Sequence, residues 1–209
     1  IGTFNQPVQV IIDTKFLKSL SKLEIQCGLM EVIKHGLISD KSFFVWLEKN
    51  LKQILSLKPQ FIERAIKRSI EIKADVVSKD EKENGLRAIL NFGHTFGHAL
   101  ETIGNNKLYT HGEAVALGML AATKLSESIS DLDPKVFDRV HSTIKNTGIK
   151  VKLKKKIVPK KLITLMQSDK KKNNSQLKFI LLEKIGKAKI KSVSNEVTIE
   201  NAIKNSLFY

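Results

Sequence analysis

Two stretches decide the fold class of this chain: HTFGHALETI at His94–Ile103 and AVALGMLAATKLSESI at residues 114–129. In both, apolar residues recur three and four positions apart, which is the period of an amphipathic helix. Gly104 follows the first stretch with the turn chemistry typical of a helix C-terminus. The same periodicity predicts earlier helices at residues 29–37, 43–51 and 61–77. The chain is therefore predicted to be mainly α-helical.

The last third of the chain continues the helical pattern with one interruption. Asp133-Pro134 predicts the start of a helix, because proline suits the first turn. Two short β-type runs flank Gly186 and predict a small hairpin. The expected elements are helices at 134–146, 162–166 and 199–205, and strands at 179–182 and 188–193.

The N-terminal residues differ from this pattern. Residues 8–13 (VQVIID) form a β-branched run after Pro7 and predict one buried strand. No glycine-rich phosphate loop follows it. We interpret the run as the tail of an α/β domain whose remainder lies upstream.

Composition excludes several classes of protein. The 209 residues are 42% hydrophobic and 27% charged, and no apolar run approaches the roughly 20 residues of a membrane span. Residues 1–10 lack the pattern of a secretory signal, and the single Cys27 excludes an internal disulfide. We expect a cytoplasmic protein that does not bind membranes.

The formal charge of +15 attracts nucleic acids, anionic lipids and small anions alike. Much of the excess lies at residues 150–161 (KVKLKKKIVPKK) and 170–172, which contain lysine without arginine or aromatic residues for base stacking. This favours a solvated surface, and no nucleic-acid partner is expected. A basic helical module that binds nucleic acid stays an alternative, and its binding would fall steeply with salt.

Three histidines and a glutamate suggest a metal site. His94 and His98 lie four residues apart on a predicted helix, so their side chains share one face. His111 follows a turn-rich connection, and Glu31 lies on an earlier helix. Two or three histidines with a carboxylate can bind a catalytic divalent metal with one open position. Ordinary polar histidines on a helix surface give the same spacing, so the pattern alone leaves both interpretations open.

Four further polar residues lie in segments with apolar neighbours: Lys34, Lys73, Arg87 and Asn91. Arginine suits bidentate contact with phosphate or carboxylate, and lysine acts as a point charge. Each residue taken alone is more typical of a solvated helix face, and only their occurrence beside the metal candidates favours a binding role.

Five motifs carry a resemblance to the C-terminal domain of 3-dehydroquinate synthases, over nearly the whole chain. The motifs are EKENGLRAILNFGHTFGHALE at residues 81–101, GLMEVIKHGLI at 28–38, HGEAVALGM at 111–119, DKK at 169–171 and the linker-like IGTFNQP at 1–7. The resemblance implies a helical metal- and substrate-binding domain at residues 14–209, with residues 1–13 left from an NAD-binding domain.

The resemblance also assigns roles to residues. Glu31, His94 and His111 match the zinc ligands of the family, and cobalt is the alternative metal. The residues that line the substrate pocket in this family correspond to His98, Lys34, Lys73, Arg87 and Asn91 of this chain, and to one of Lys170 and Lys171. The stretch that contacts NAD in this family corresponds to Phe16, Leu17, Lys18 and Ser19 of this chain.

The implied reaction converts 3-deoxy-D-arabino-heptulosonate 7-phosphate into 3-dehydroquinate and phosphate, in the shikimate pathway. It proceeds by transient oxidation with NAD, phosphate elimination, reduction, ring opening and aldol closure. Because NAD needs a nucleotide-binding domain, we expect the fragment alone to be inactive. The family further implies a homodimer.

Three alternatives accompany this interpretation, and one of them is a non-catalytic regulatory remnant that uses the metal only structurally. Related sugar-phosphate cyclases form 2-deoxy-scyllo-inosose or valienone-type products on the same framework, although inosose-forming relatives typically have an acidic residue in place of Asn91. A metal-dependent alcohol dehydrogenase has a similar architecture but does not need the basic set for phosphate. Cys27 could be a fourth ligand, but packing as a small hydrophobe is the expected role.

Overall fold

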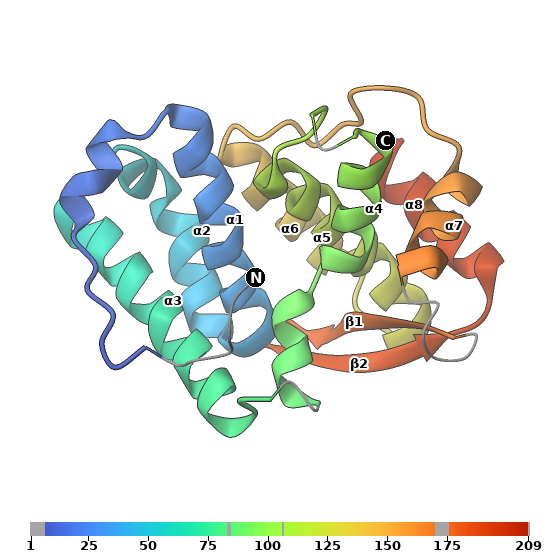
Figure 1. Cartoon of the computed structure of the whole chain (residues 1–209), viewed down its shortest axis with the longest axis horizontal. Coiled ribbons are helices and arrows are strands. Elements are labelled where there is room, and N and C mark those ends of the chain that lie inside the picture. The colour runs from blue at the N-terminus through green and yellow to red at the C-terminus, as the bar shows by residue number, and fades with distance from the viewer. Residues whose placement is uncertain (1–6, 83–84, 106, 170–175, 209) are drawn as a thin grey trace.

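The computed structural model describes residues 7–82, 85–105, 107–169 and 176–208, and its elements follow one another as in Figure 1. They are η1 (Thr14–Ser19), α1 (Lys22–Ser39), α2 (Lys41–Leu55), α3 (Pro59–Lys79), η2 (Leu86–Asn91), α4 (His94–Ile103), α5 (His111–Ser130), α6 (Lys135–Asn146), α7 (Pro159–Asp169), β1 (Leu177–Lys184), β2 (Lys187–Val193) and α8 (Glu196–Leu207). The predicted helices and the hairpin are confirmed. No helix in these ranges combines the length and apolar character needed to cross a membrane.

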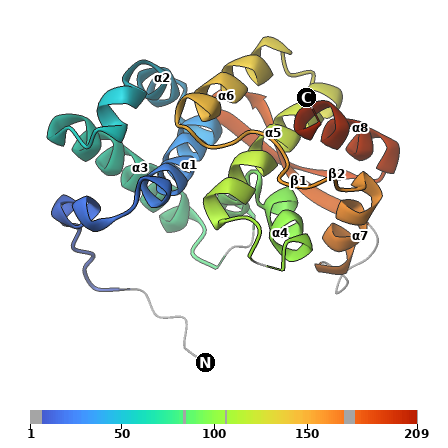
Figure 2. The same cartoon turned by 90° about the horizontal axis from the view of Figure 1, so that it is seen from above.

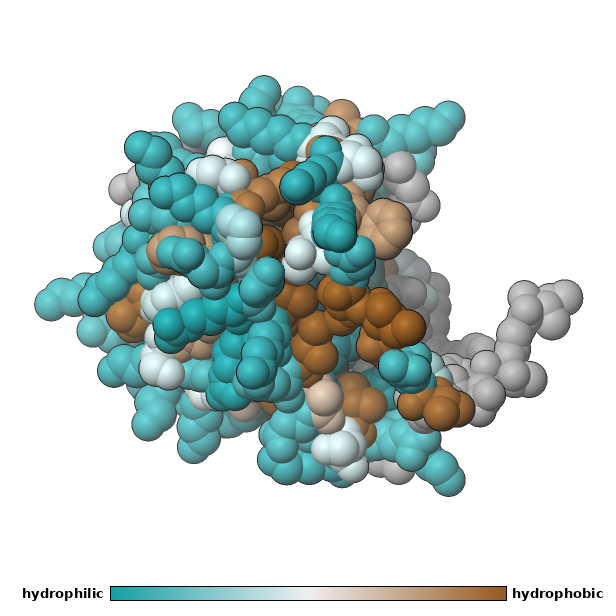
Figure 3. Space-filling model, turned by 90° about the vertical axis from the view of Figure 1, so that its left-hand side faces the viewer, coloured by the Kyte–Doolittle hydropathy of each residue, from teal (hydrophilic) through white to brown (hydrophobic). Residues whose placement is uncertain are grey.

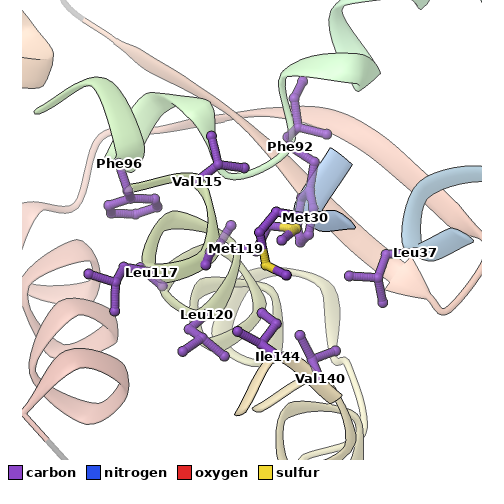
Figure 4. Close-up of a cluster of buried hydrophobic side chains, with 14 of the residues drawn as sticks. Met30, Leu37, Phe92, Phe96, Val115, Leu117, Met119, Leu120, Val140 and Ile144 are labelled. Carbon is purple, nitrogen blue, oxygen red and sulfur yellow. The ribbon is translucent and has the colours of Figure 1, made fainter. Parts of the chain in front are cut away.

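Helix α5 is the centre of the molecule, and it contacts α1, α4, α6, α8 and β1 (Figures 1 and 2). Its sequence explains this position, because residues 112–123 are small or apolar almost all around the helix and every one of them is buried. Close-packed side chains from the neighbouring elements surround it, among them Met30, Phe96 and Val140 (Figure 4).

Capping boxes fix the first residues of both α1 and α5. Ser21 accepts a hydrogen bond from the Glu24 N–H, and the Glu24 carboxylate accepts one from the Ser21 N–H. Thr110 and Glu113 repeat the arrangement at the start of α5. These reciprocal bonds satisfy N–H groups that a helix otherwise leaves without partners.

The hairpin covers the core on one side. Strands β1 and β2 are antiparallel, with Ile180 opposite Ile190. Gly186, at a φ of +85°, makes the turn between them and donates its N–H to the Leu37 carbonyl at 2.8 Å. The turn is thereby tied to the end of α1.

The predicted N-terminal strand is wrong for the described residues. Residues 8–13 are neither in a strand nor buried, and Val8, Ile11 and Ile12 are exposed. A strand needs a neighbouring strand to pair with, and the sheet formed by the described residues contains β1 and β2 but not residues 8–13. Exposed Phe16 and Leu20 follow in and after η1, and apolar side chains gather on this side of the molecule (Figure 3).

Candidate metal centre

Helices α4 and α5 cross at close range because of two glycines. A Cβ on Gly118 would lie 2.0 Å from the Gly93 carbonyl oxygen, which is impossible without moving a helix. Gly93 has a φ of +81°, a conformation that glycine adopts without strain. Farther along, Gly97 approaches Ala114, so the two helices run antiparallel. This contact brings the start of α5 to the face of α4 that carries the histidines.

Three potential metal ligands converge from three helices. Glu31 of α1, His94 of α4 and His111 of α5 each offer one ligand atom, and these atoms lie within 4.8 Å of one another. The His94 Nε2 is 3.7 Å from Glu31 Oε1, and the ring centroids of His94 and His111 are 5.4 Å apart. The predicted set is therefore brought together, although its members are up to 80 residues apart in sequence.

The protein groups around Glu31 leave one of its oxygens unsatisfied. Oε2 accepts a hydrogen bond from Lys34 Nζ at 2.5 Å, whereas Oε1 is buried and has no hydrogen-bond partner among the described residues. A buried carboxylate oxygen in this condition is costly. A cation between Oε1 and the two imidazoles would satisfy it, and a glutamate with two histidines suits zinc or cobalt with an open position. The residues present thus fit a divalent metal.

Both histidine rings have a partner at Nδ1. The His94 Nδ1 lies 3.2 Å from the Phe92 carbonyl oxygen, and the His111 Nδ1 lies 3.2 Å from Glu101 Oε1. A carbonyl or carboxylate oxygen accepts hydrogen bonds, so each Nδ1 is the donor and each Nε2 keeps its lone pair. The lone pairs are available to a metal.

The charges at the centre favour the ligand forms of these side chains. Burial and then the charge of Lys34 lower the pKa of His94 to about 4, against the opposing effect of Glu31. Burial raises the pKa of Glu31, but the ammonium group and hydrogen bond of Lys34 outweigh it and the pKa falls below its ordinary value. Burial also lowers the pKa of Lys34, more than Glu31 raises it. At neutral pH His94 is neutral and Glu31 is ionised, as metal binding requires.

His98 lies beside the three ligands but outside their group. Its ring centroid is 5.4 Å from that of His94 and 6.4 Å from that of His111, and its side chain is exposed. It borders a hollow of about 310 Å³ between α4 and α7, lined by Thr95, His98, Ala99, Thr102, Leu165, Met166 and Ser168. His98 is therefore accessible to a molecule that enters this hollow.

The basic residues of the predicted pocket lie at different distances from the centre. Lys34 is buried against Glu31, and Lys73 of α3 is close enough for its charge to lower the pKa of Lys34. Arg87 and Asn91 lie on η2, which packs against α1 and α3 just before His94. The Arg87 guanidinium donates to the Glu81 carbonyl at 2.6 Å. It would need to release this bond, or use its other N–H groups, to bind an anion.

The predicted NAD contacts lie apart from the metal ligands. Phe16, Leu17, Lys18 and Ser19 are in η1, and Phe16 is 75% exposed. Glu31 lies ten residues beyond the Ser21 cap of α1, roughly 15 Å along the helix axis. Lys170 and Lys171 lie outside the described residues.

Cys27 is half-buried, with its Sγ 3.1 Å from Thr110 Oγ1, and it packs against Gly112. It is not a member of the ligand group found among the described residues. The structure therefore gives it a packing role between α1 and the start of α5.

The sequence prediction did not include two contacts that hold His111 and the start of α5. Glu101 contacts His111, and Lys154 donates to Glu113 Oε2 at 2.7 Å and to the Leu108 carbonyl at 2.9 Å. Glu101 lies seven residues after His94, so its place on the same helix face could have been read from the sequence. Lys154 belongs to the run interpreted as solvated surface; it is exposed, as that interpretation expects, but its ammonium group also binds groups before and within the first turn of α5.

Sequence comparison identifies the relatives of the chain. A family model described as 3-dehydroquinate synthase C-terminal matches residues 28–172. The 3-dehydroquinate synthase of Thermoanaerobacter pseudethanolicus is 43% identical over 196 residues, which cover 94% of this chain and 55% of that protein. The 3-dehydroquinate synthase of Nitrosomonas europaea is 45% identical over 188 residues, which cover 90% and 51%. The chain thus spans about half the length of these curated relatives.

Two solved structures share the fold. A 2-epi-5-epi-valiolone synthase from Streptomyces hygroscopicus, with NAD+ and Zn2+ bound, superposes with a TM-score of 0.87 at 23% identity and covers 98% of this chain and 57% of that one. A 2-deoxy-scyllo-inosose synthase complexed with carbaglucose-6-phosphate, NAD+ and Co2+ gives a TM-score of 0.80 at 25% identity and covers 93% and 56%. The helical fold is that of sugar-phosphate cyclases.

Proposed function

The chain belongs to the 3-dehydroquinate synthase C-terminal family, and we propose that residues 14–209 form the metal- and substrate-binding domain of a 3-dehydroquinate synthase. Residues 1–13 would be the connection to its NAD-binding domain. The observation that carries the proposal is the convergence of Glu31, His94 and His111, with Oε1 of Glu31 buried and lacking a hydrogen-bond partner in the part of the chain that the structure describes. Relatives with this name at 43–45% identity support it.

The proposed reaction is the conversion of 3-deoxy-D-arabino-heptulosonate 7-phosphate into 3-dehydroquinate and phosphate, a step of the shikimate pathway. Glu31, His94 and His111 would hold Zn2+ or Co2+, since related cyclases are solved with these ions and with NAD+. Such a metal, when bound, would polarise a substrate hydroxyl and lower its pKa. The contacts to NAD would come from Phe16, Leu17, Lys18 and Ser19, and the cofactor would supply the redox chemistry of the transient oxidation.

The residues of the chain would bind and orient the substrate. Lys34 and Lys73 place positive charge beside the metal ligands, and Arg87 and Asn91 of η2 would reach the phosphate or carboxylate, together with Lys170 or Lys171. His98, exposed beside the ligand group, would hold or release a proton at its ring nitrogens. Because His94 is neutral at neutral pH, the positive charge that attracts the anionic substrate would come from these basic residues.

A test of the metal centre uses elemental analysis of the purified chain after incubation with zinc. We expect about one zinc per chain in the wild type and none in a His94→Ala, His111→Ala double variant. His141→Ala is the matched control, because His141 lies on α6 and stacks on Phe137. Equal zinc in the double variant would reject the ligand assignment.

A second test addresses the substrate class. Calorimetric titration of the zinc-loaded chain should show binding of 3-deoxy-D-arabino-heptulosonate 7-phosphate, weakened about tenfold or more by Lys73→Ala, because an interaction with a charged group is lost. Glucose 6-phosphate serves as the competing ligand for the inosose-forming alternative. Preference for glucose 6-phosphate would favour that alternative.

The remaining expectations concern the complete protein. Among the described residues the only sheet is a two-stranded hairpin, whereas dinucleotide folds use a parallel sheet, so we expect no turnover by these 209 residues alone. We further propose that the complete enzyme is a cytoplasmic homodimer.

A further inference from the structure

We infer that Glu101 is a positioning residue for the metal centre: it fixes the ring orientation and tautomer of His111 so that Nε2 faces Glu31 and His94. The inference rests on the proposed function, since it concerns one of the three proposed ligands. The observation that carries it is the 3.2 Å contact between Glu101 Oε1 and His111 Nδ1.

Each of the three ligands has one atom held by the protein, but the holding groups differ. Lys34 donates to Glu31 Oε2, and the Phe92 carbonyl lies beside His94 Nδ1. His94 is further restrained by burial, since its side chain is only 13% exposed, whereas the Glu31 side chain is 37% exposed and is held mainly by Lys34. The His111 side chain is 53% exposed, so packing restrains its ring much less. Besides ring contacts with His94 and His98, the polar contact with Glu101 is the restraint on the His111 ring among the described residues.

The antiparallel crossing of α4 and α5 places Glu101 opposite His111. Gly93 meets Gly118 and Gly97 meets Ala114, so the last turn of α4 reaches the first residue of α5. The Glu101 side chain is only 20% exposed and is held on the rigid helix that also carries His94. Its carboxylate thus has a fixed position from which to accept the Nδ1–H of the ring.

The chemical consequence is twofold. A ring whose Nδ1 carries the proton presents the lone pair of Nε2, and a carboxylate at Nδ1–H makes Nε2 a more basic ligand. Loss of such a partner typically weakens metal binding about 10–100-fold. Glutamine at position 101 would keep an oxygen acceptor but lose the charge, whereas alanine would remove both.

The backbone of His111 has a separate support. Glu113 accepts hydrogen bonds from the Thr110 N–H and from Lys154, and so fixes the first turn of α5. A defect in this support would shift the whole helix start, whereas loss of Glu101 would free only the ring. Glu113→Gln therefore serves as a comparison that alters the helix start without touching the ring of His111.

The first measurement is nitrogen NMR of the histidine side chains in the metal-free full chain at mildly alkaline pH. We expect His111 to be protonated at Nδ1 in the wild type, to keep this tautomer in Glu101→Gln, and to shift towards the Nε2–H form in Glu101→Ala. The Glu113→Gln chain should keep the wild-type tautomer. An unchanged tautomer in Glu101→Ala would overturn the inference, whether or not the protein binds metal.

The second measurement is titration with Co2+, followed through its visible absorption bands. Glu101→Ala should bind Co2+ about 10–100-fold more weakly than the wild type, Glu101→Gln should lie between them, and the exposed control Glu63→Ala should match the wild type. Equal affinity in Glu101→Ala and the wild type would overturn the inference. If the wild-type chain has the expected tautomer but binds no Co2+, the proposed metal site fails while the Glu101–His111 contact stands.

Discussion

Lys34 is the residue on which the electrostatics of the centre depend. It is only 3% exposed, it donates to Glu31, and its charge lowers the pKa values of both His94 and His35 after the effect of burial. Burial and this one ammonium group together lower the pKa values of the two histidines, and the ammonium group also helps to keep Glu31 ionised. His35 itself is not near enough to join the ligand group, and its Nδ1 lies 2.6 Å from Ser69 Oγ in the contact between α1 and α3.

His35 should make the stability of the fold depend on pH. Burial, and then the charge of Lys34, lower its pKa to about 4, whereas an unfolded histidine titrates near 6.5. Between these values the unfolded chain binds the proton and the folded chain does not, so stability falls as the pH falls from about 6.5 to 4. The shift corresponds to about 3 kcal/mol.

The measurement is urea unfolding of the metal-free chain, with a chelator present, across this pH range. Because Gln cannot titrate but can still bond to Ser69, we expect His35→Gln to remove most of the His35 contribution. His141→Gln should change the slope less, since His141 is only partly buried. Equal pH slopes in the wild type and His35→Gln would contradict the assignment.

At the scale of elements, sequence periodicity predicted what local patterns determine and missed what depends on distant partners. The helix at His94–Ile103 was predicted because its apolar spacing and Gly104 lie within one segment. Residues 8–13 have the composition of a strand, but pairing depends on a neighbour that the segment itself cannot specify. Glu101 was missed as a partner for the same reason, since only the α4–α5 crossing reveals His111 opposite it.

That crossing gives a matched pair of glycine variants. Gly118→Ala would place its Cβ 2.0 Å from the Gly93 oxygen, so the helices must separate, and we expect a loss of about 1–3 kcal/mol or more in unfolding free energy. Metal affinity should fall as well, because His94 and His111 lie on the two separated helices. In Gly28→Ala, the added Cβ has no atom within 4 Å, and the variant should gain about 0.5–1 kcal/mol from higher helix propensity.

Chemical denaturation of both variants, with Co2+ titration of each, checks this comparison. A Gly118→Ala chain as stable as the wild type would mean that α4 and α5 do not approach as closely as the glycines indicate. A destabilised Gly28→Ala chain would instead show that α1 tolerates no change beside Glu31.

For the whole molecule, the metal centre joins segments that the chain order keeps far apart. α1, which packs with α2 and α3, supplies Glu31, whereas α4 and α5 supply the histidines. A metal bound only by the folded chain therefore stabilises the contact between these groups of helices. The expected gain is RT ln(1 + [L]/Kd), about 2.7 kcal/mol at a free metal concentration of 100 times Kd.

This gain should appear as a rise in thermal midpoint on addition of zinc. For a chain of this size, about 2–4 °C per kcal/mol gives a rise of roughly 5–10 °C, reversed by a chelator. His94→Ala should show no rise, and the exposed control Glu63→Ala should behave as the wild type. An equal rise in His94→Ala would place the stabilising metal elsewhere. If zinc does not change the thermal midpoint of the wild type, the three helices do not bind metal tightly enough to be stabilised by it. Oε1 of Glu31, which has no hydrogen-bond partner among the described residues, would then need another partner.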